Sequence, residues 1–302
     1  MAIVSIIDIG THSVRGLVAE ITDGQPPKIL SESRLTTRLG EGLSRTGRLS
    51  QQALERAIVA ISSLCETANE YKVTQVRAVA TCAVREARNG AVLVDRVEAE
   101  MGIKIEVISP TQEVGLSYRG IRFSGVVEAT NIVFADLGGG SLEIMFASRT
   151  QIESVIPTQL GAIRTTEMYK LEQAVSNETE QSVKKYIKKT LEDASIPHHQ
   201  GDRSLVMCGG AALAVAALMS GDLVDENQLN SESHRWNGAS VQLNAAVLIV
   251  DNLKHLDYEQ RSIVTGLSRD RAAVIVAGIW ALVGLMECLG IDSYVLGAYG
   301  IR

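Results

Sequence analysis

The sequence is poor in the features that mark secreted, membrane-embedded or zinc-finger proteins. It has four cysteines, far apart and without a C-x-x-C pair, so neither a disulfide framework nor a zinc site is indicated and we expect reduced thiols in the cytoplasm. The longest apolar run, residues 272–286, contains two glycines and is shorter than the roughly 20 residues that cross a bilayer, which predicts a buried helix. The N-terminus has no basic segment and reaches an acid at Asp8, so a signal peptide is not expected.

Several catalytic and binding motifs are also missing. No H-E-x-x-H spacing, no Ser/His/Asp order and no P-loop Gly-Lys-Ser/Thr occurs. The pair His198 and His199 follows a proline and reads as a loop tip rather than a metal site. The net charge of −6 argues against sequence-independent binding of nucleic acid, so a polyanionic ligand would need a local basic pocket.

What is present is the composition of a globular protein. Apolar residues make up 46% of the chain and charged residues 21%. A length of 302 residues is enough for two domains of ordinary size, each with its own core.

An internal repeat is the most informative pattern. An apolar strand, an acid, a glycine-rich turn and a second apolar strand occur at residues 3–21 and again at 131–147, and Asp8 aligns with Asp136 at a separation of 128 residues. Two hairpins so spaced indicate a duplicated α/β domain. We expect a first domain over residues 1–124 and a second over 125–302, whose last helix could pack back on the first.

Strands and helices alternate through both halves. The first half has expected strands at 28–34, 75–80 and 104–108 and helices near 51–71, 84–101 and 111–123. The second half has expected strands at 151–158 and 204–207 and helices near 162–171, 178–194, 211–220, 240–253 and 270–289. The alternation predicts a largely parallel sheet covered by helices, and residues 220–238 read as a surface loop.

The two glycine-rich turns are candidate phosphate sites. Successive backbone N–H groups at the tip of such a turn form a concavity that binds phosphate oxygens. Asp8 and Asp136 end the strands beside the turns, where carboxylates can hold Mg²⁺. A single hairpin would more often be an ordinary tight turn, but a matched pair favours a site. Glu143 offers a second carboxylate, with a cross-strand salt bridge on a sheet face as the alternative.

Other candidates follow the remaining strands. Glu113 opens a helix, where capping is the structural alternative. Arg85 could reach a phosphate at the carboxyl edge of the sheet or be a solvated arginine. Gly209 and Gly210 join a strand to a helix, which suits a phosphate nest and a packing turn equally. A basic stripe at helical spacing reads as a solvated face more readily than as a polyanion track and consists of Lys184, Lys185, Lys188 and Lys189.

These motifs, taken in order, resemble the exopolyphosphatase / guanosine pentaphosphate phosphatase family, within the superfamily of actin, sugar kinases and heat-shock chaperones. The resemblance covers nearly the whole chain and rests on residues 8–15, 39–43, 80–89, 108–113, 136–143, 160–164 and 208–211. It implies two duplicated ribonuclease-H-like (actin-like ATPase) domains with an active-site cleft between them.

The resemblance also implies roles for individual residues. Glu113 matches the family's catalytic glutamate, which orients or deprotonates the attacking water, and Arg85 matches an arginine that holds phosphate. Asp136 and Glu143 match the acids that support Mg²⁺, for which Mn²⁺ could substitute. The expected phosphate-binding set is Asp8, Gly10, Thr11, His12, Ser13, Arg15, Gly138, Gly139, Gly140, Ser141, Gly209, Gly210 and Arg271.

The implied reaction is release of terminal orthophosphate from polyphosphate or guanosine pentaphosphate by in-line attack of water. His12, Leu142 and Ala298 depart from the family's pattern, so a non-hydrolysing guanosine tetra- or pentaphosphate sensor is one alternative, and an ATP-using kinase or ATPase is another. The chain stops at Arg302, without the C-terminal helical domain of longer members, which predicts distributive cutting of long polyphosphate. No nucleic-acid or membrane partner is expected, and a homodimer is the assembly considered.

Overall fold

The computed structural model describes residues 1–301 apart from 26, 126–130, 149–150, 198–202 and 222–232. His198, His199 and most of the predicted loop at 220–238 therefore lie outside the described residues. The contacts divide the chain into unit 1 (Met1–Glu113) and unit 2 (Val114–Ile301). This division falls inside helix α5 (Pro110–Phe123), whereas the sequence predicted a boundary after residue 124, just beyond that helix.

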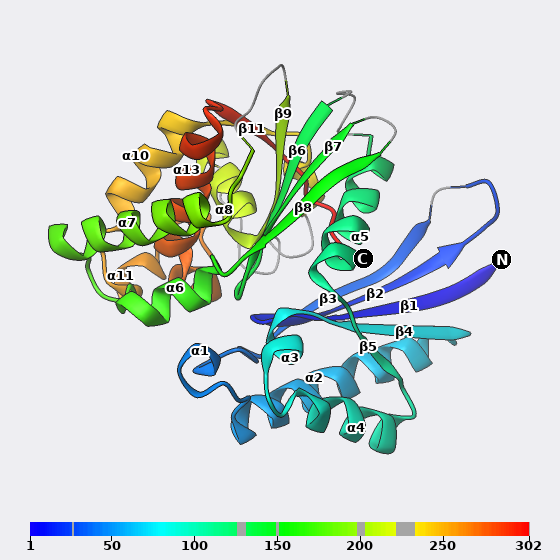
Figure 1. The fold of residues 1–302 in the computed structure, drawn as a ribbon. Helices are drawn as coiled ribbons and strands as arrows, with labels where there is room; N and C mark the ends of the chain where they lie inside the picture. The colour runs from blue at the N-terminus through cyan, green and yellow to red at the C-terminus, as the bar shows by residue number, and fades with distance from the viewer. Residues whose placement is uncertain (26, 126–130, 149–150, 198–202, 222–232, 302) are drawn as a thin grey trace. The chain divides into compact units, whose positions relative to one another are not determined.

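Unit 1 is built on a five-stranded sheet in the order β3-β2-β1-β4-β5 (Figure 1). Its strands are β1 (Ala2–Ile9), β2 (Ser13–Ile21), β3 (Lys28–Thr36), β4 (Gln75–Ala80) and β5 (Ile105–Val107). Helices α2 (Gln51–Glu70) and α4 (Gly90–Met101) cover one face, and the short helices α1 (Leu43–Thr46) and α3 (Cys82–Glu86) lie in the connections. Apolar residues at alternate positions of β1, such as Ile7 and Ile9, pack on α2, as expected for a sheet covered on that face.

Unit 2 contains a six-stranded sheet in the order β10-β11-β9-β6-β7-β8. Its strands are β6 (Asn131–Leu137), β7 (Leu142–Ser148), β8 (Ile152–Thr158), β9 (Ser204–Gly209), β10 (Ser240–Gln242) and β11 (Ser293–Leu296). Helix α5 covers one face, and the opposite face carries the larger core. The helices and 3-10 turn that follow β8 are α6 (Ala162–Tyr169), α7 (Asn177–Asp193), α8 (Gly210–Ser220), η1 (Ser233–Trp236), α10 (Leu243–Leu253), α11 (Tyr258–Arg261), α12 (Arg269–Ala272) and α13 (Ile275–Leu289).

Helix α13 confirms that the long apolar run is a buried helix. It packs against α6, α7, α8 and α10, so the last helix belongs to the core of its own unit. Among the residues that the structure describes, none of the helices combines the length and apolar character that a bilayer span requires.

The two sheets repeat one topology. Strands β6, β7, β8, β9 and β11 take the places of β1, β2, β3, β4 and β5, and β10 is added at one edge of the second sheet. In each unit the first three strands pair antiparallel, and the later strands are parallel to the first, except for the edge strand β10, which pairs antiparallel with β11. The prediction of a largely parallel sheet was therefore wrong, and both sheets are mixed. Short connections make the second and third strands of each unit run antiparallel to the strand before them.

The predicted helix at 84–101 is two helices, α3 and α4. Between them Ala87 is extended, with φ −72° and ψ 130°. The side chain of Asn89 accepts from the backbone N–H of Leu49 at 2.8 Å and donates to its carbonyl at 3.0 Å. A contact 40 residues away in sequence therefore interrupts the helix.

Two other predicted helices differ from the structure near their N-terminal ends. Residues 240–242 form the edge strand β10, which pairs antiparallel with β11, a strand that the sequence did not predict. The helix predicted at 270–289 is interrupted after Ala272, where Val274 bonds back to Arg271 by a three-residue turn.

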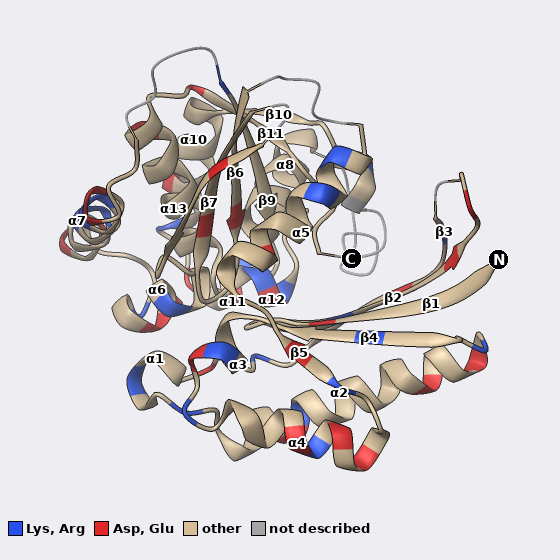
Figure 2. Cartoon of the chain, turned by 45° about the vertical axis from the view of Figure 1, so that its right-hand side comes forward, with Lys and Arg blue, Asp and Glu red and all other residues tan. Residues whose placement is uncertain are grey.

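The lysine stripe lies on α7 as a solvated face. Lys184 pairs with Glu180 at 2.7 Å, Lys188 with Glu192 at 3.8 Å and Lys189 with Asp193 at 3.2 Å, each one helical turn apart. Figure 2 shows the blue and red positions of this helix interleaved. Such exposed pairs each stabilise a helix by about 0.3–0.5 kcal/mol, which favours the structural interpretation of the stripe over a polyanion track.

A buried arginine ties three segments of unit 2 together. Arg261 is fully buried and donates to the carbonyl oxygens of Leu253 at 3.0 Å, Leu171 at 2.6 Å and Gln173 at 3.1 Å. Burial lowers the pKa of Arg261 to about 10, so the side chain stays charged at neutral pH.

Replacing this arginine should destabilise unit 2. Arg261→Met would leave three carbonyl groups without their donor, each costing about 1–3 kcal/mol, so the free energy of unfolding should fall by about 3 kcal/mol or more in urea titrations. Arg269→Met, at an exposed arginine of the same unit, should change it by less than about 0.5 kcal/mol. Equal effects of the two substitutions would contradict this role.

Candidate active site

The two predicted hairpins exist, and their turns have the same geometry. In the first, the N–H of Gly10 donates to the carbonyl of Ser13 at 3.1 Å, and in the second the N–H of Gly138 donates to the carbonyl of Ser141 at 2.9 Å. The strands on either side are in the same register, so the repeat seen in the sequence is a repeat of backbone structure.

In unit 1 a returning segment supports the turn from behind. After β3, the N–H of Gly40 donates to the carbonyl of Thr11 at 2.9 Å. The carbonyl of His12 accepts from the N–H groups of Thr37 at 3.1 Å and Arg38 at 2.8 Å. The carbonyl groups of the turn are thereby satisfied within the protein.

In unit 2 the start of α6 plays the same part. The carbonyl of Gly139 accepts from the N–H groups of Ile163 at 2.9 Å and Arg164 at 3.2 Å, and the carbonyl of Gly140 accepts from Nε of Arg164 at 2.9 Å. Within the described residues, the N–H groups of Gly139 and Gly140 have no hydrogen-bond partner. A turn with its carbonyls occupied and successive N–H groups available is suited to bind an anion.

Both supporting segments need a glycine at the point of contact. A Cβ on Gly161 would lie 2.2 Å from the carbonyl oxygen of Gly139, and a Cβ on Gly40 would lie 2.3 Å from Cγ2 of Thr11. The residue before each glycine is a fully buried leucine, Leu39 in unit 1 and Leu160 in unit 2. The Leu-Gly pair is therefore part of the duplicated turn, a role that the sequence analysis did not assign.

Asp136 and Glu143 are directly opposite each other on β6 and β7. Directly opposite residues of an antiparallel pair point to the same face of the sheet, so the two carboxylates are neighbours. Glu143 is only 1% exposed, and Asp136 is half-buried. Two carboxylates at directly opposite positions of a sheet, one of them buried, favour the binding of a cation.

The donor set fits a magnesium ion. Both side chains offer the hard carboxylate oxygens that Mg²⁺ prefers. Within the described part of the chain, no three histidine, cysteine or carboxylate side chains come close enough to hold a metal ion by themselves. Mg²⁺ is typically held by one or two carboxylates and completes its coordination with water and substrate phosphates, so a pair is sufficient.

The first hairpin differs in charge at the equivalent place. Asp8 stands opposite Arg15, and Arg15 in turn stands opposite Arg34 on β3. Nε of Arg34 donates to the hydroxyl of Ser13 at 3.3 Å. The first turn is therefore flanked by two arginines, of which the sequence analysis had singled out only Arg15.

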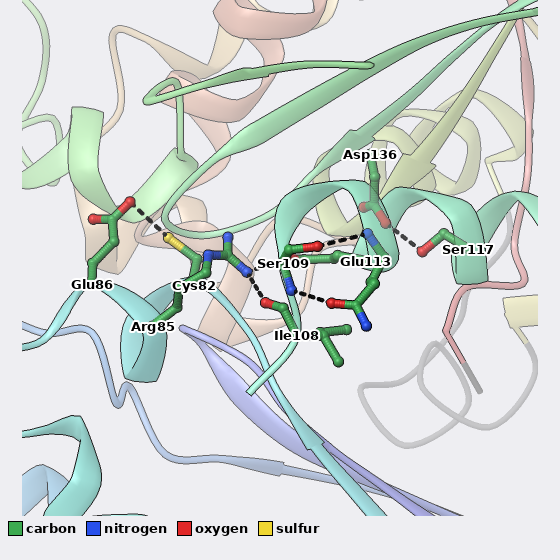
Figure 3. A network of polar contacts seen from close by, with 9 residues as sticks. Cys82, Arg85, Glu86, Ile108, Ser109, Glu113, Ser117 and Asp136 are labelled. Carbon is green, nitrogen blue, oxygen red and sulfur yellow. Dashed lines mark hydrogen bonds and ion pairs between the residues drawn. The ribbon is translucent and has the colours of Figure 1, made fainter. Parts of the chain in front are cut away.

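Arg85 and Glu113 meet within unit 1 (Figure 3). Nη1 of Arg85 donates to Oε2 of Glu113 at 2.9 Å and to the carbonyl of Ile108 at 2.8 Å. Arg85 is thus anchored at the end of β5 and holds the carboxylate of Glu113 in place. The contact with a phosphate predicted for Arg85 stays a prediction, and no pattern in the sequence indicates its ion pair with Glu113.

Glu113 is not the residue that caps α5. The hydroxyl of Ser109 accepts from the N–H of Gln112 at 3.2 Å, and the side chain of Gln112 accepts from the N–H of Ser109 at 2.9 Å. This reciprocal pair, with Pro110 at the first helical position, is a capping box. Ser109 and Gln112 therefore cap α5, and Glu113 does not.

Gly209, Gly210 and Arg271 come together in unit 2. Gly209 has φ +108°, and a Cβ there would lie 2.2 Å from the carbonyl oxygen of Leu137 in the second hairpin. Nη1 of Arg271, which is 5% exposed, donates to the carbonyl of Gly210 at 2.8 Å. The three residues therefore lie next to the second turn, at the start of α8.

The structure places every candidate residue in the described part of the chain. Unit 1 contains the first turn and the Arg85–Glu113 ion pair. Unit 2 contains the second turn, with Asp136 and Glu143 opposite each other on its two strands and Gly209 packed against Leu137. No role was predicted from the sequence for Gly40, Gly161, Arg34, Arg164 or Ser117, although Gly40, Gly161 and Arg164 lie in segments that carry the resemblance. The repeated Leu-Gly spacing could have revealed the first two, but the others became visible only through contacts with distant residues.

Comparison with known proteins gives one consistent result. The model of the Ppx/GppA phosphatase family matches residues 17–302. Exopolyphosphatase 1 of Mycobacterium leprae is 24% identical over 98% of this chain and 86% of its own length. A guanosine-5'-triphosphate,3'-diphosphate pyrophosphatase of Vibrio parahaemolyticus is 25% identical over 98% of this chain, which spans only 57% of that protein.

A solved structure shows the same fold. The crystal structure of the Aquifex aeolicus member of the Ppx/GppA protein family superposes with a TM-score of 0.80, at 28% identity, over 100% of this chain and 95% of the other. The expectation of two duplicated actin-like α/β domains agrees with this match.

The contact between Gly161 and the second turn can be tested directly. In Gly161→Ala the added methyl would collide with backbone atoms of the turn, so unfolding should be easier by about 1–3 kcal/mol. In Gly115→Ala, on α5, the added Cβ meets no atom within 4 Å, and removal of a helical glycine should stabilise by about 0.5–1 kcal/mol. Urea denaturation of both variants measures the difference, and a neutral Gly161→Ala would contradict the proposed fit.

Proposed function

Because the chain belongs to the Ppx/GppA phosphatase family, we propose that it is a phosphohydrolase that releases terminal orthophosphate from inorganic polyphosphate, guanosine pentaphosphate or both. The observation that carries the proposal is the second hairpin, where an anion-binding turn and two neighbouring carboxylates occur together. Relatives named for these substrates support the choice.

The turns and their arginines bind the phosphate groups in this proposal. The N–H groups of Gly139 and Gly140 donate to phosphate oxygens, and the positive charge of Arg271 lies next to the same turn. In the first hairpin, Arg15 and Arg34 supply positive charge beside the turn formed by residues 10–13. Phosphoryl transfer relies mainly on such positioning and charge stabilisation.

Asp136 and Glu143 are the residues that would hold the divalent cation. When bound, Mg²⁺ or Mn²⁺ supplies charge neutralisation on the phosphate oxygens. The bound cation would also reduce the electrostatic repulsion between the carboxylates of Asp136 and Glu143, which lie at directly opposite positions of β6 and β7.

Glu113 is the proposed general base. Its carboxylate is held by Arg85 and is 12% exposed, so its orientation is restricted and little water surrounds it. It accepts a proton from the attacking water as the water oxygen bonds to the terminal phosphorus and the bridging oxygen leaves. Arg85 acts on the reaction through Glu113, besides any contact with substrate.

The proposal includes a cytoplasmic location. All four cysteines are free, and a reducing compartment keeps such thiols free. The proposal also includes a homodimer, which a measurement of the molecular mass in solution would test.

A substrate panel tests the proposed activity. Phosphate release should occur from short polyphosphate, guanosine pentaphosphate or both, should require Mg²⁺ or Mn²⁺, and should stop when a chelator is added. Long polyphosphate and ATP complete the panel. Binding of guanosine pentaphosphate without release would instead favour the sensor, and faster consumption of ATP than of polyphosphate would favour a kinase or ATPase. Undiminished turnover in chelator would contradict the cation site.

Glu113→Gln tests the general base. Glutamine keeps the shape of the side chain but cannot take up a proton, so kcat should fall by a factor of about 10² to 10⁴, while binding of substrate changes little. The matched control is Gln112→Ala, which removes half of the capping box one residue away and should lower stability by about 1 kcal/mol with kcat near wild type. A folded Glu113→Gln protein that keeps more than about half of its kcat, far outside that range, would refute the assignment.

A further inference from the structure

Helix α5 carries a buried serine on the face that packs against the sheet of unit 2. Its buried residues are Val114, Ser117 and Ile121, and Ser117 is fully buried. Val114 and Ile121 belong to an apolar cluster with residues of β6, β7 and β9. A hydroxyl in such surroundings is unfavourable unless it has a hydrogen-bond partner.

The partner of this hydroxyl is one of the two acids of the second hairpin. Oγ of Ser117 donates to Oδ2 of Asp136 at 2.8 Å (Figure 3). The bond uses one carboxylate oxygen, so it restrains rotation of the group and leaves the other oxygen, Oδ1, available to a cation. For packing and helix formation alone, alanine would serve better than serine at this position.

We propose that Ser117 is a positioning residue for the divalent-cation site, which holds the carboxylate of Asp136 in the orientation that the cation requires. The proposal rests on the proposed function, in which Asp136 and Glu143 hold that cation. Groups that hydrogen-bond to a metal-binding carboxylate commonly set the affinity of the site, and losing one typically weakens binding about 10- to 100-fold.

The same helix also carries Glu113. Ser117 follows it by four residues, which is about one helical turn, so both side chains leave α5 on a similar side. Arg85 holds Glu113, and Asp136 accepts from Ser117. Two consecutive turns of α5 thus each have a polar anchor, and Ser117 is the anchor that concerns the cation.

The test measures binding of Mn²⁺ without substrate, by the loss of the free-ion signal in electron paramagnetic resonance. Ser117→Ala should bind Mn²⁺ about 10-fold more weakly than wild type. The control is Ser124→Ala, where the hydroxyl at the end of the same helix donates to the carbonyl of Ile121 at 2.7 Å, away from the acids. This control should bind Mn²⁺ like wild type.

Kinetics and a conservative variant separate positioning from general damage. Ser117→Ala should need about 10-fold more Mg²⁺ for half-maximal activity but recover most of kcat when Mg²⁺ is saturating. Ser117→Thr keeps the hydroxyl and, if folded by its thermal melting curve, should restore Mn²⁺ binding.

The outcomes separate a failure of the role proposed for Ser117 from a failure of the proposed cation site. If wild type binds Mn²⁺ and Ser117→Ala binds it equally well, the positioning role of Ser117 is wrong while the cation site stands. A wild-type protein that releases phosphate yet binds no Mn²⁺ overturns the role of Ser117 together with the cation site. An equal loss of affinity in Ser124→Ala would also overturn it, because the effect would then belong to the helix as a whole.

Discussion

A hairpin turn that offers its N–H groups to an anion has to satisfy its carbonyl groups elsewhere, and this constraint organises both units. In each unit the third strand is followed by a segment whose N–H groups bond to those carbonyls, at Thr11 and His12 in unit 1 and at Gly138 and Gly139 in unit 2. The segment can return there only because the third strand pairs antiparallel with the second. The three-stranded antiparallel ribbon therefore supports the turn in each unit, and the later strands and helices give the ribbon a core.

The duplication preserves the backbone of this ribbon but not its charge. Asp8 faces Arg15 in the first copy, whereas Asp136 faces Glu143 in the second. Two carboxylates at directly opposite positions on one face of a sheet favour a bound cation. Under the proposed function, the difference at this one aligned position would let the first copy bind phosphate and the second copy also hold the metal.

Much of the fold follows from local pattern, as the hairpins and the strand at 75–80 show, because alternation and glycine turns act over a few residues. The errors come from distant contacts. Asn89 interrupts a helix by bonding to Leu49, and β10 is a three-residue edge strand that only pairing with β11 stabilises. The candidate site also contains residues that only distant contacts reveal. Its acids and glycines stand out as a repeat, whereas Ser117 looks like any serine of an amphipathic helix until Asp136 is seen beside it.

The anchoring of Arg85 bears on how Glu113 can work as a base. One nitrogen of Arg85 is shared between the backbone carbonyl of Ile108 and the carboxylate of Glu113, so the guanidinium is fixed to the end of β5 rather than free to follow a ligand. A carboxylate held by a fixed cation loses rotational freedom before the substrate arrives, and the cost of ordering it is met during folding instead of during each reaction cycle. The capping box at Ser109 and Gln112 fixes the backbone beneath it. Under the proposed function, Glu113 would therefore owe its orientation to the fixed guanidinium of Arg85, while the capping box stabilises the helix that carries it.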